Sequence, residues 1–198
     1  YGASNLGSVA KALETLGYSP VISSDPKIIS KAQTLILPGQ GRCDKGMKRL
    51  DDLGLSYVIR NSIEKGKPFL GVCVGLQILF QLSEEGNANC LGILPGKVLK
   101  FPETEKIPHM GWNSLIFSNH LNTWEGTLLK NNNPSDEVYF IHSFMATPSN
   151  NNNRIADCIY GGHRIAAVVK NENIAGCQFH PEKSQKDGLQ LLKNFTNW

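Results

Sequence analysis

One cysteine in the sequence has neighbours that favour chemistry. Cys73 lies between Gly71 and Gly75, at G-x-C-x-G spacing, where an apolar run ends and a helical pattern begins. This spacing is typical of a nucleophile elbow, a sharp strand-to-helix turn that exposes a side chain above the edge of a sheet. A helix N-terminus lowers a thiol pKa, and the N–H of Val74 is placed to stabilise an oxyanion. We therefore predict a nucleophile at Cys73, although a cysteine in an apolar run is more often a small buried hydrophobe.

A nucleophilic cysteine needs a base, and a candidate lies near the other end of the chain. His180 and Glu182 follow an expected strand, and only Pro181 separates them. Residues two apart on extended backbone point to the same side, and proline biases the preceding residue away from helix. Cys73, His180 and Glu182 could thus form a triad of nucleophile, base and orienting carboxylate. A lone His-x-Glu pair is usually solvated surface, so the prediction depends on its combination with the elbow.

The two motifs together resemble the class I glutamine amidotransferases, in which a cysteine attacks the side-chain amide of glutamine and releases ammonia. The motifs are G-V-C-V-G-L-Q at residues 71–77 and Q-F-H-P-E-K-S at residues 178–184. Four more segments resemble one branch of that family, the glutaminase subunits of imidazole glycerol phosphate synthase: residues 1–6, 37–41, 107–113 and 139–144. The P-H-M-G-W-N run within residues 107–113 is specific to this branch.

The resemblance implies a fold and a reaction. The expected fold is a single three-layer α/β domain over residues 1–198, flavodoxin-like, with a mixed and largely parallel central sheet. The expected reaction is hydrolysis of L-glutamine without metal or cofactor. The ammonia would pass to a barrel-shaped cyclase subunit that makes imidazole glycerol phosphate, with aminoimidazole carboxamide ribotide as by-product, in histidine biosynthesis. This branch places a core β-strand just before Tyr1-Gly2, so we expect the N-terminal strand to be missing.

The resemblance also assigns roles to residues outside the triad. The second oxyanion donor would come from the backbone around Gln40 and Gly41, where Gln40 replaces a small apolar residue usual in the family. The amino-acid end of the substrate would lie against Gln77, Ser143 and Phe144. The residues expected to face the cyclase are Asn5, His109, Met110, Trp112, Asn113 and Lys183. By residue type alone, Gln77 and Ser143 would be structural. The cluster of His109, Met110, Trp112 and Asn113 could equally be core.

Composition narrows the class of protein further. The chain has 198 residues, 40% apolar and 19% charged, which is ordinary for one globular domain. Its net charge of +3 is too small, and its basic residues too scattered, to indicate a nucleic-acid partner. Five widely spaced cysteines favour reduced thiols in a cytosolic protein over disulfides or zinc. No apolar run is long enough to span a membrane.

Hydrophobic periodicity predicts alternating strands and helices in the first half and mainly strands in the second. Expected helices are residues 5–16, a short one after Asp25-Pro26, 45–65 with a break at Gly54, a pattern over 76–82, and 187–195. Expected strands are residues 18–22, 34–37, 69–72, 96–101, 113–117, 137–145, 155–160, 164–169 and 174–179.

Two other functions fit the same motifs. A paralogous glutaminase with the same triad could supply ammonia to an enzyme that aminates sugars for surface polysaccharides. A catalytically silent regulatory partner could keep the fold without hydrolysis, although the intact set of Cys73, His180 and Glu182 argues against it.

Overall fold

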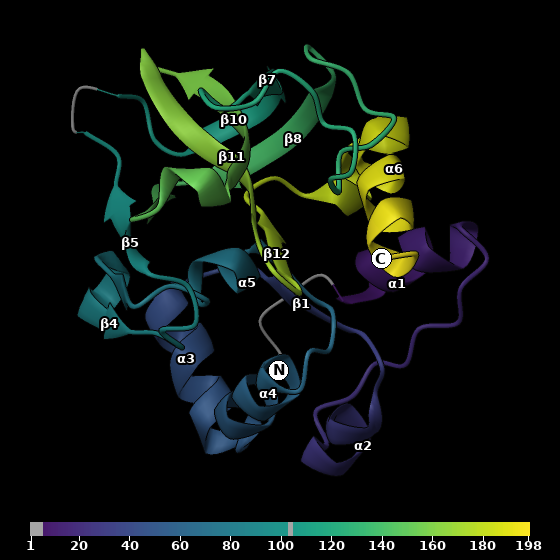
Figure 1. The fold of residues 1–198 in the computed structure, drawn as a ribbon. Coiled ribbons are helices and arrows are strands. Elements are labelled where there is room, and N and C mark those ends of the chain that lie inside the picture. Colours follow the sequence, from purple (N-terminus) through teal and green to yellow (C-terminus); the bar gives the residue numbers. More distant parts are fainter. Residues whose placement is uncertain (1–5, 103–104) are drawn as a thin grey trace.

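A six-stranded sheet forms the centre of the computed structural model, which describes residues 6–102 and 105–198 (Figure 1). Its strands, in spatial order, are β1 (Leu35–Gly39), β2 (Phe69–Cys73), β12 (Ile174–Cys177), β11 (His163–Asn171), β10 (Arg154–Tyr160) and β7 (Ile116–Phe117). A second sheet has the order β4 (Ala88–Asn89), β3 (Leu82–Ser83), β5 (Gly96–Lys100) and β9 (Phe144–Pro148). A third pairs β6 (His109–Ser114) with β8 (Glu137–His142).

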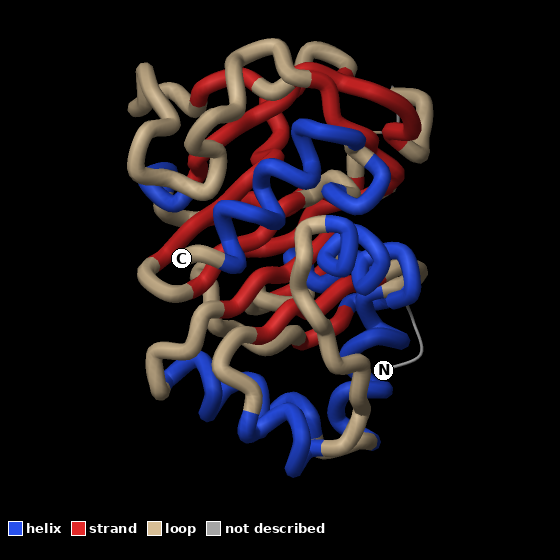
Figure 2. The backbone as a smooth tube through the Cα atoms, turned by 90° about the vertical axis from the view of Figure 1, so that its right-hand side faces the viewer, coloured by secondary structure: helices blue, strands red, loops and turns tan. Residues whose placement is uncertain are grey.

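Helices cover both faces of the central sheet, which confirms the predicted layered α/β domain (Figure 1). The α-helices are α1 (Leu6–Thr15), α2 (Pro26–Lys31), α3 (Cys43–Asp52), α4 (Leu55–Glu64), α5 (Val74–Gln77) and α6 (Gln185–Thr196). Short 3-10 turns are η1 (Glu85–Asn87), η2 (Asn151–Asn153) and η3 (Pro181–Lys183). Figure 2 shows α6 crossing in front of the strands. Each long helix buries one apolar stripe, such as Leu55, Ile59 and Ile63 of α4.

The central sheet is mixed, as predicted, but less parallel than expected. Only β1 with β2 and β2 with β12 pair in parallel, whereas β12, β11, β10 and β7 pair antiparallel. The reason is the length of the connections. Very short turns join β10 to β11 and β11 to β12, and a short turn can only place consecutive strands antiparallel.

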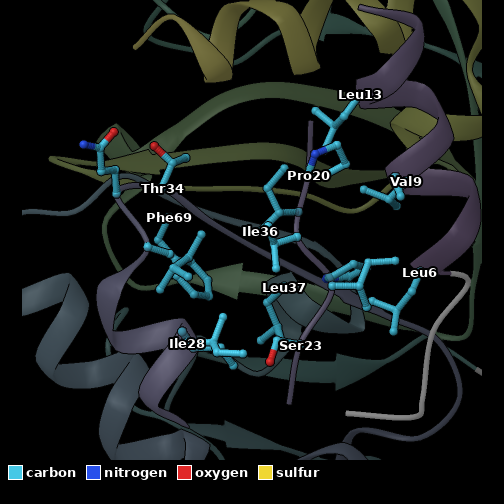
Figure 3. A pocket seen from close by; sticks show the side chains of 18 of the residues that line it. Leu6, Val9, Leu13, Pro20, Ser23, Ile28, Thr34, Ile36, Leu37 and Phe69 are labelled. Carbon is cyan, nitrogen blue, oxygen red and sulfur yellow. The ribbon is translucent and has the colours of Figure 1, made fainter. Parts of the chain in front are cut away.

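The strand predicted at residues 18–22 is wrong. These residues form no strand, and Val21 and Ile22 are 77% and 55% exposed. A strand needs a partner, and among the described residues β1 pairs only with β2. An apolar groove of about 520 Å³ lies along β1 instead. Figure 3 shows side chains of α1 and β1 lining it, among them Leu6, Val9, Leu13, Ile36 and Leu37.

The helix predicted over residues 76–82 is also wrong in length. α5 ends at Gln77, and residues 82–83 form β3. The apolar spacing misled because Ile78, Leu79 and Phe80 are all fully buried, so they define no face. Backbone N–H groups of residues 91–94 donate to their carbonyls, which a continuing helix would have used itself.

The remaining elements appear where expected, with shifted ends. The predicted helix at 45–65 is α3 followed by α4, and it breaks at Gly54, which has a φ of 68°. The predicted strand at 137–145 is two strands, β8 and β9, which separate at Ser143. The predicted strand at 113–117 begins earlier, with β6, and continues after a break as β7. Within residues 6–102 and 105–198 no helix is long and apolar enough to cross a membrane.

Candidate active site

Cys73 stands on a strained turn between β2 and α5. Its φ of 54° and ψ of −110° are unusual for a residue with a side chain, and such strain collects at functional sites. The flanking glycines allow the turn. A Cβ on Gly71 would lie 2.5 Å from the Gly75 carbonyl oxygen, and one on Gly75 would lie 1.8 Å from the Leu37 carbonyl oxygen. The backbone therefore has the geometry of the predicted nucleophile elbow.

His180 and Glu182 form a buried pair. Nδ1 of His180 lies 2.8 Å from Oε1 of Glu182, and each side chain is 2% exposed. The sequence predicted that these two side chains would meet, but it predicted an extended backbone between them. β12 ends at Cys177, and Glu182 lies in the 3-10 turn η3, so a turn and not an extended strand brings the two side chains together.

The charge state of His180 depends on its neighbours. Burial lowers the pKa of this imidazole, but interactions with Cys73 and with Glu182 outweigh burial and raise the pKa to about 9. Nε2 of His180 makes no hydrogen bond of ordinary geometry within the described residues. Glu182 thus occupies one ring nitrogen, and the other is open for proton transfer at Cys73.

Two groups hold the thiol of Cys73. Its Sγ lies 3.8 Å from the carbonyl oxygen of Ile141 and 3.8 Å from Nε2 of Gln178. Gln178 is fully buried and accepts a hydrogen bond of 3.1 Å from Gln77, which also donates to the carbonyl oxygen of Phe144 at 3.0 Å. The sequence analysis missed Gln178 as a site residue, although it is the first residue of the Q-F-H-P-E-K-S motif.

The loop expected to complete the oxyanion hole leaves the sheet beside Cys73. Gly39, the last residue of β1, is in register with Cys73, so Gln40 and Gly41 leave the sheet beside the elbow. Gly41 has a φ of +86°, in the region that favours glycine.

A nucleophile, a base held by a carboxylate, and adjacent backbone amides are the parts needed for acyl transfer from an amide. Among the described residues, no cluster of three or more potential metal ligands occurs. The sequence matches the family "Glutamine amidotransferase class-I" over residues 1–198. The chain belongs to the class I glutamine amidotransferase family. This confirms the family predicted from the elbow and the His-Pro-Glu motif.

Two relatives are similar to this chain over nearly their whole length. The chain is 44% identical to "Imidazole glycerol phosphate synthase subunit HisH 1" of Legionella pneumophila (strain Lens), over 98% of this chain and 95% of the relative. It is 46% identical to the HisH subunit of Aquifex aeolicus, over 98% of this chain and 92% of the relative.

Solved structures share the fold. A crystal structure titled as a glutamine amidotransferase matches with a TM-score of 0.76 at 18% identity, covering 98% of this chain and 94% of the other. The structure of PurLQS from Thermotoga maritima matches with a TM-score of 0.70 at 22% identity, covering 100% and 94%.

In this amidotransferase, the residues expected to face a partner divide between surface and interior. Met110 and Trp112 are 57% and 46% exposed, and they alternate along β6 with inward-facing neighbours. His109 is 3% exposed, so its predicted interface role is wrong. Asn113 is half-buried and donates to the Ile159 carbonyl oxygen at 2.8 Å. Asn5 lies outside the described residues.

Trp112, Tyr139 and Lys183 form a cluster that we call the aromatic patch. The Trp112 and Tyr139 rings meet edge to face at 5.9 Å, and Nζ of Lys183 lies 5.9 Å from the centre of the Tyr139 ring. The patch is joined to the active site, since the Tyr139 carbonyl oxygen accepts a hydrogen bond of 2.9 Å from the His180 N–H. Tyr139 was named in the sequence analysis only as part of a motif.

A pair of buried histidines connects β6 with the site. Nδ1 of His142 must donate to the Phe144 carbonyl oxygen at 2.8 Å, so its Nε2 accepts from Nδ1 of His109 at 2.9 Å. Nε2 of His109 then accepts from Asn113 at 3.2 Å. Burial lowers the pKa of His109 to about 4 and that of His142 to about 3, so both are neutral at physiological pH. Their role is to hold β6, β8 and β9 together.

Proposed function

We propose that this chain is the glutaminase subunit of an imidazole glycerol phosphate synthase. It hydrolyses L-glutamine to glutamate and ammonia, and it delivers the ammonia to a cyclase subunit in histidine biosynthesis. The observation that carries this proposal is Cys73 on a strained elbow, close enough to the His180–Glu182 pair to help raise the pKa of His180. The names of the near full-length relatives favour histidine biosynthesis over a polysaccharide client.

Each group has a step in the proposed reaction. With its proton already on His180, Sγ of Cys73 attacks the side-chain amide carbon of glutamine. The backbone N–H of Val74 and one from the Gln40–Gly41 loop stabilise the oxyanion. His180 then gives its proton to the departing nitrogen, so ammonia leaves and a glutamyl thioester remains. Water attacks the thioester with His180 as base, which releases glutamate and restores Cys73 with the proton on His180.

Glu182 keeps the imidazole in the required orientation. Its Oε1 accepts from Nδ1 of His180, which leaves Nε2 directed to the reacting atoms. We place the amino-acid end of the substrate against Gln77, Ser143 and Phe144. Gln77 donates to the Phe144 carbonyl oxygen and to Gln178, which contacts the thiol. Thiol, imidazole, carboxylate and backbone amides supply each step, so no metal or cofactor enters the mechanism.

We place the cyclase, expected to have a barrel fold, on the aromatic patch and Met110. Exposed tryptophan and methionine suit interface anchors, and a cation beside aromatic rings adds specificity. The patch is next to His180, so ammonia released there would have a short path to the partner. We expect the complex to work in the cytosol, where the five cysteines stay reduced.

The proposal is tested by comparing synthesis from glutamine with synthesis from added ammonium salt. Cys73→Ala should lower glutamine-dependent synthesis by the complex by about 10⁴-fold or more, because the nucleophile is lost. Synthesis by the same complex from added ammonium salt should remain unchanged. Both rates are measured as formation of imidazole glycerol phosphate.

Two results would contradict the proposal. Equal loss of both activities would mean that Cys73 supports the structure of the complex and not the supply of ammonia. Glutamine-dependent synthesis that survives in Cys73→Ala would mean that another residue attacks glutamine. Cys158→Ala, which removes a buried thiol outside the site, is the control for general damage.

A further inference from the structure

Two cysteines outside the active site face each other in the interior. Cys43 is the first residue of α3, and Cys90 follows β4, 47 residues later. Their Sγ atoms lie 3.4 Å apart, and the side chains are 0% and 7% exposed. Oxidation of this pair would need an approach of only about 1.4 Å, because a disulfide bond is about 2.0 Å long.

The two thiols differ in reactivity. The hydrogen bond with Cys90, together with burial, raises the pKa of Cys43, whereas the hydrogen bond from Cys43 lowers the pKa of Cys90. Cys90 is also the more exposed of the two. The thiolate is the reactive form, so Cys90 would meet an oxidant first and Cys43 would resolve it. Cys158, by contrast, is fully buried, and burial raises its pKa to about 12.

The pair adjoins the loop that we assign to the oxyanion hole. Cys43 follows Gly41 by two residues, so it anchors the far end of that loop. Its N–H donates to Oε2 of Glu85 at 2.6 Å, and Glu85 lies in η1, between β3 and β4. A disulfide between Cys43 and Cys90 would join the start of α3 covalently to the segment that follows η1.

We propose that Cys43 and Cys90 form a redox site that peroxide converts into a disulfide. The thiolate of Cys90 attacks one oxygen of hydrogen peroxide, the O–O bond breaks, and one water leaves after proton uptake. Cys90 is then a sulfenic acid. Cys43 attacks its sulfur, the S–O bond breaks, and a second water leaves. In total, two thiols and one hydrogen peroxide give one disulfide and two waters.

This proposal does not depend on the glutaminase assignment, and it agrees with reduced cysteines in the resting protein. Disulfides in reducing compartments are usually transient and redox-sensing. The bond would close a loop of about 47 residues, so the oxidised protein should melt roughly 5–10 °C higher than the reduced one.

Peptide mapping tests the proposal directly. Trypsin cleaves after lysine and arginine but not before proline, so it leaves the Lys67–Pro68 bond intact. It gives a short peptide of residues 43–45 and a long peptide of residues 66–97, which contains both Cys73 and Cys90. The folded chain is therefore prepared as Cys73→Ser, so that the long peptide has one thiol. It is treated with increasing concentrations of hydrogen peroxide, alkylated in denaturant and digested, and the peptides are analysed by mass spectrometry. We expect the two peptides to become joined in most molecules, with dithiothreitol reversing the link.

The controls are Cys43→Ser, Cys90→Ser and Cys158→Ser in the same background. The first two should lose the link and the rise in melting temperature, and the third should keep both. Free cysteine added to the same tube shows that the peroxide is active. If this cysteine is oxidised while the thiols at positions 43 and 90 remain free, the proposal is overturned. An equally abundant link from Cys43 or Cys90 to Cys158 or Cys177 would also overturn it, because a specific pair would then not exist.

Discussion

His180 is the residue on which the proposed chemistry depends most closely. Burial lowers the pKa of a histidine, so His109 and His142 are neutral at physiological pH. His180 differs because Cys73 and Glu182 face it, and its pKa rises from 6.5 to about 9 despite burial. It therefore holds a proton for the leaving ammonia over the physiological range.

The raised pKa of His180 predicts how the activity depends on pH. Activity with glutamine should fall as pH rises through about 9, because His180 then loses the proton that it gives to ammonia. Glu182→Gln should move this fall to lower pH, since it removes a charge that raises the pKa. It should also lower turnover by about 10²–10⁴-fold. The pH profile of turnover measures both, and an unchanged upper limb in Glu182→Gln would contradict the assigned role.

The same pair links pH to stability. The pKa of His180 is higher in the folded than in the unfolded protein, so its stabilising contribution is complete below about 6.5 and disappears as pH rises through about 9. The difference in unfolding free energy between the natural chain and Glu182→Gln should shrink over that window. Denaturant titrations at several pH values measure it, and a difference that grows with pH would contradict the sign.

Site residues differ in how far the sequence predicts them. Cys73, Val74 and the His180–Glu182 pair stand in short local patterns, although the pair meets through the turn η3 and not on the extended strand that its spacing suggested. His109 was expected at the surface, but it is buried because it pairs across the β6–β8 ladder with His142 and stacks on Phe140 and Tyr160. Contacts of that kind join residues more than thirty positions apart, and no spacing rule encodes them.

At the scale of elements, strand pairing decided which predictions held. Apolar runs with a partner strand, such as β1 and β2, form where the sequence places them. The run at residues 18–22 has no partner and forms no strand. Among residues 6–102 and 105–198, no strand pairs with the outer edge of β1, and an apolar groove lies beside that edge. Such an edge is unfavourable in water, since it binds other strands and promotes aggregation.

We propose that this groove can bind an apolar strand along β1. An apolar segment of about 5–12 residues joined before Tyr1 should pair with β1 and fill the groove. The melting temperature should rise by roughly 5 °C or more, measured by calorimetry. A segment of equal length with charged residues in place of the apolar ones is the control. No rise, or an equal rise with the control, would contradict the proposal.

At the scale of the whole molecule, one exposed surface lies beside the buried active site. The aromatic patch, with Met110 beside it on β6, presents exposed apolar side chains next to His180. Exposed Trp and Met are costly on a free surface and favourable when a partner covers them. The predicted partner face is therefore retained for Met110, Trp112 and Lys183, and Tyr139 joins it.

Substitutions on this surface should affect assembly and leave the fold intact. Trp112→Ala and Lys183→Ala should each weaken binding of the cyclase by about 10-fold or more. Tyr57→Ala, which removes a 74% exposed aromatic side chain on α4, is the matched control and should leave binding unchanged. Calorimetric titration gives the affinities. Equal loss in all three variants, or loss only in Tyr57→Ala, would place the interface elsewhere.

The central claim is that Cys73 alone attacks glutamine, and covalent trapping tests it most directly. The chain with its cyclase partner is incubated with a chloroketone analogue of glutamine, digested and analysed by mass spectrometry. The account predicts one adduct per chain, on Cys73, that excess glutamine prevents and that Cys73→Ala abolishes. An adduct on Cys43, Cys90, Cys158 or Cys177 that glutamine prevents, or no adduct on Cys73, would contradict it.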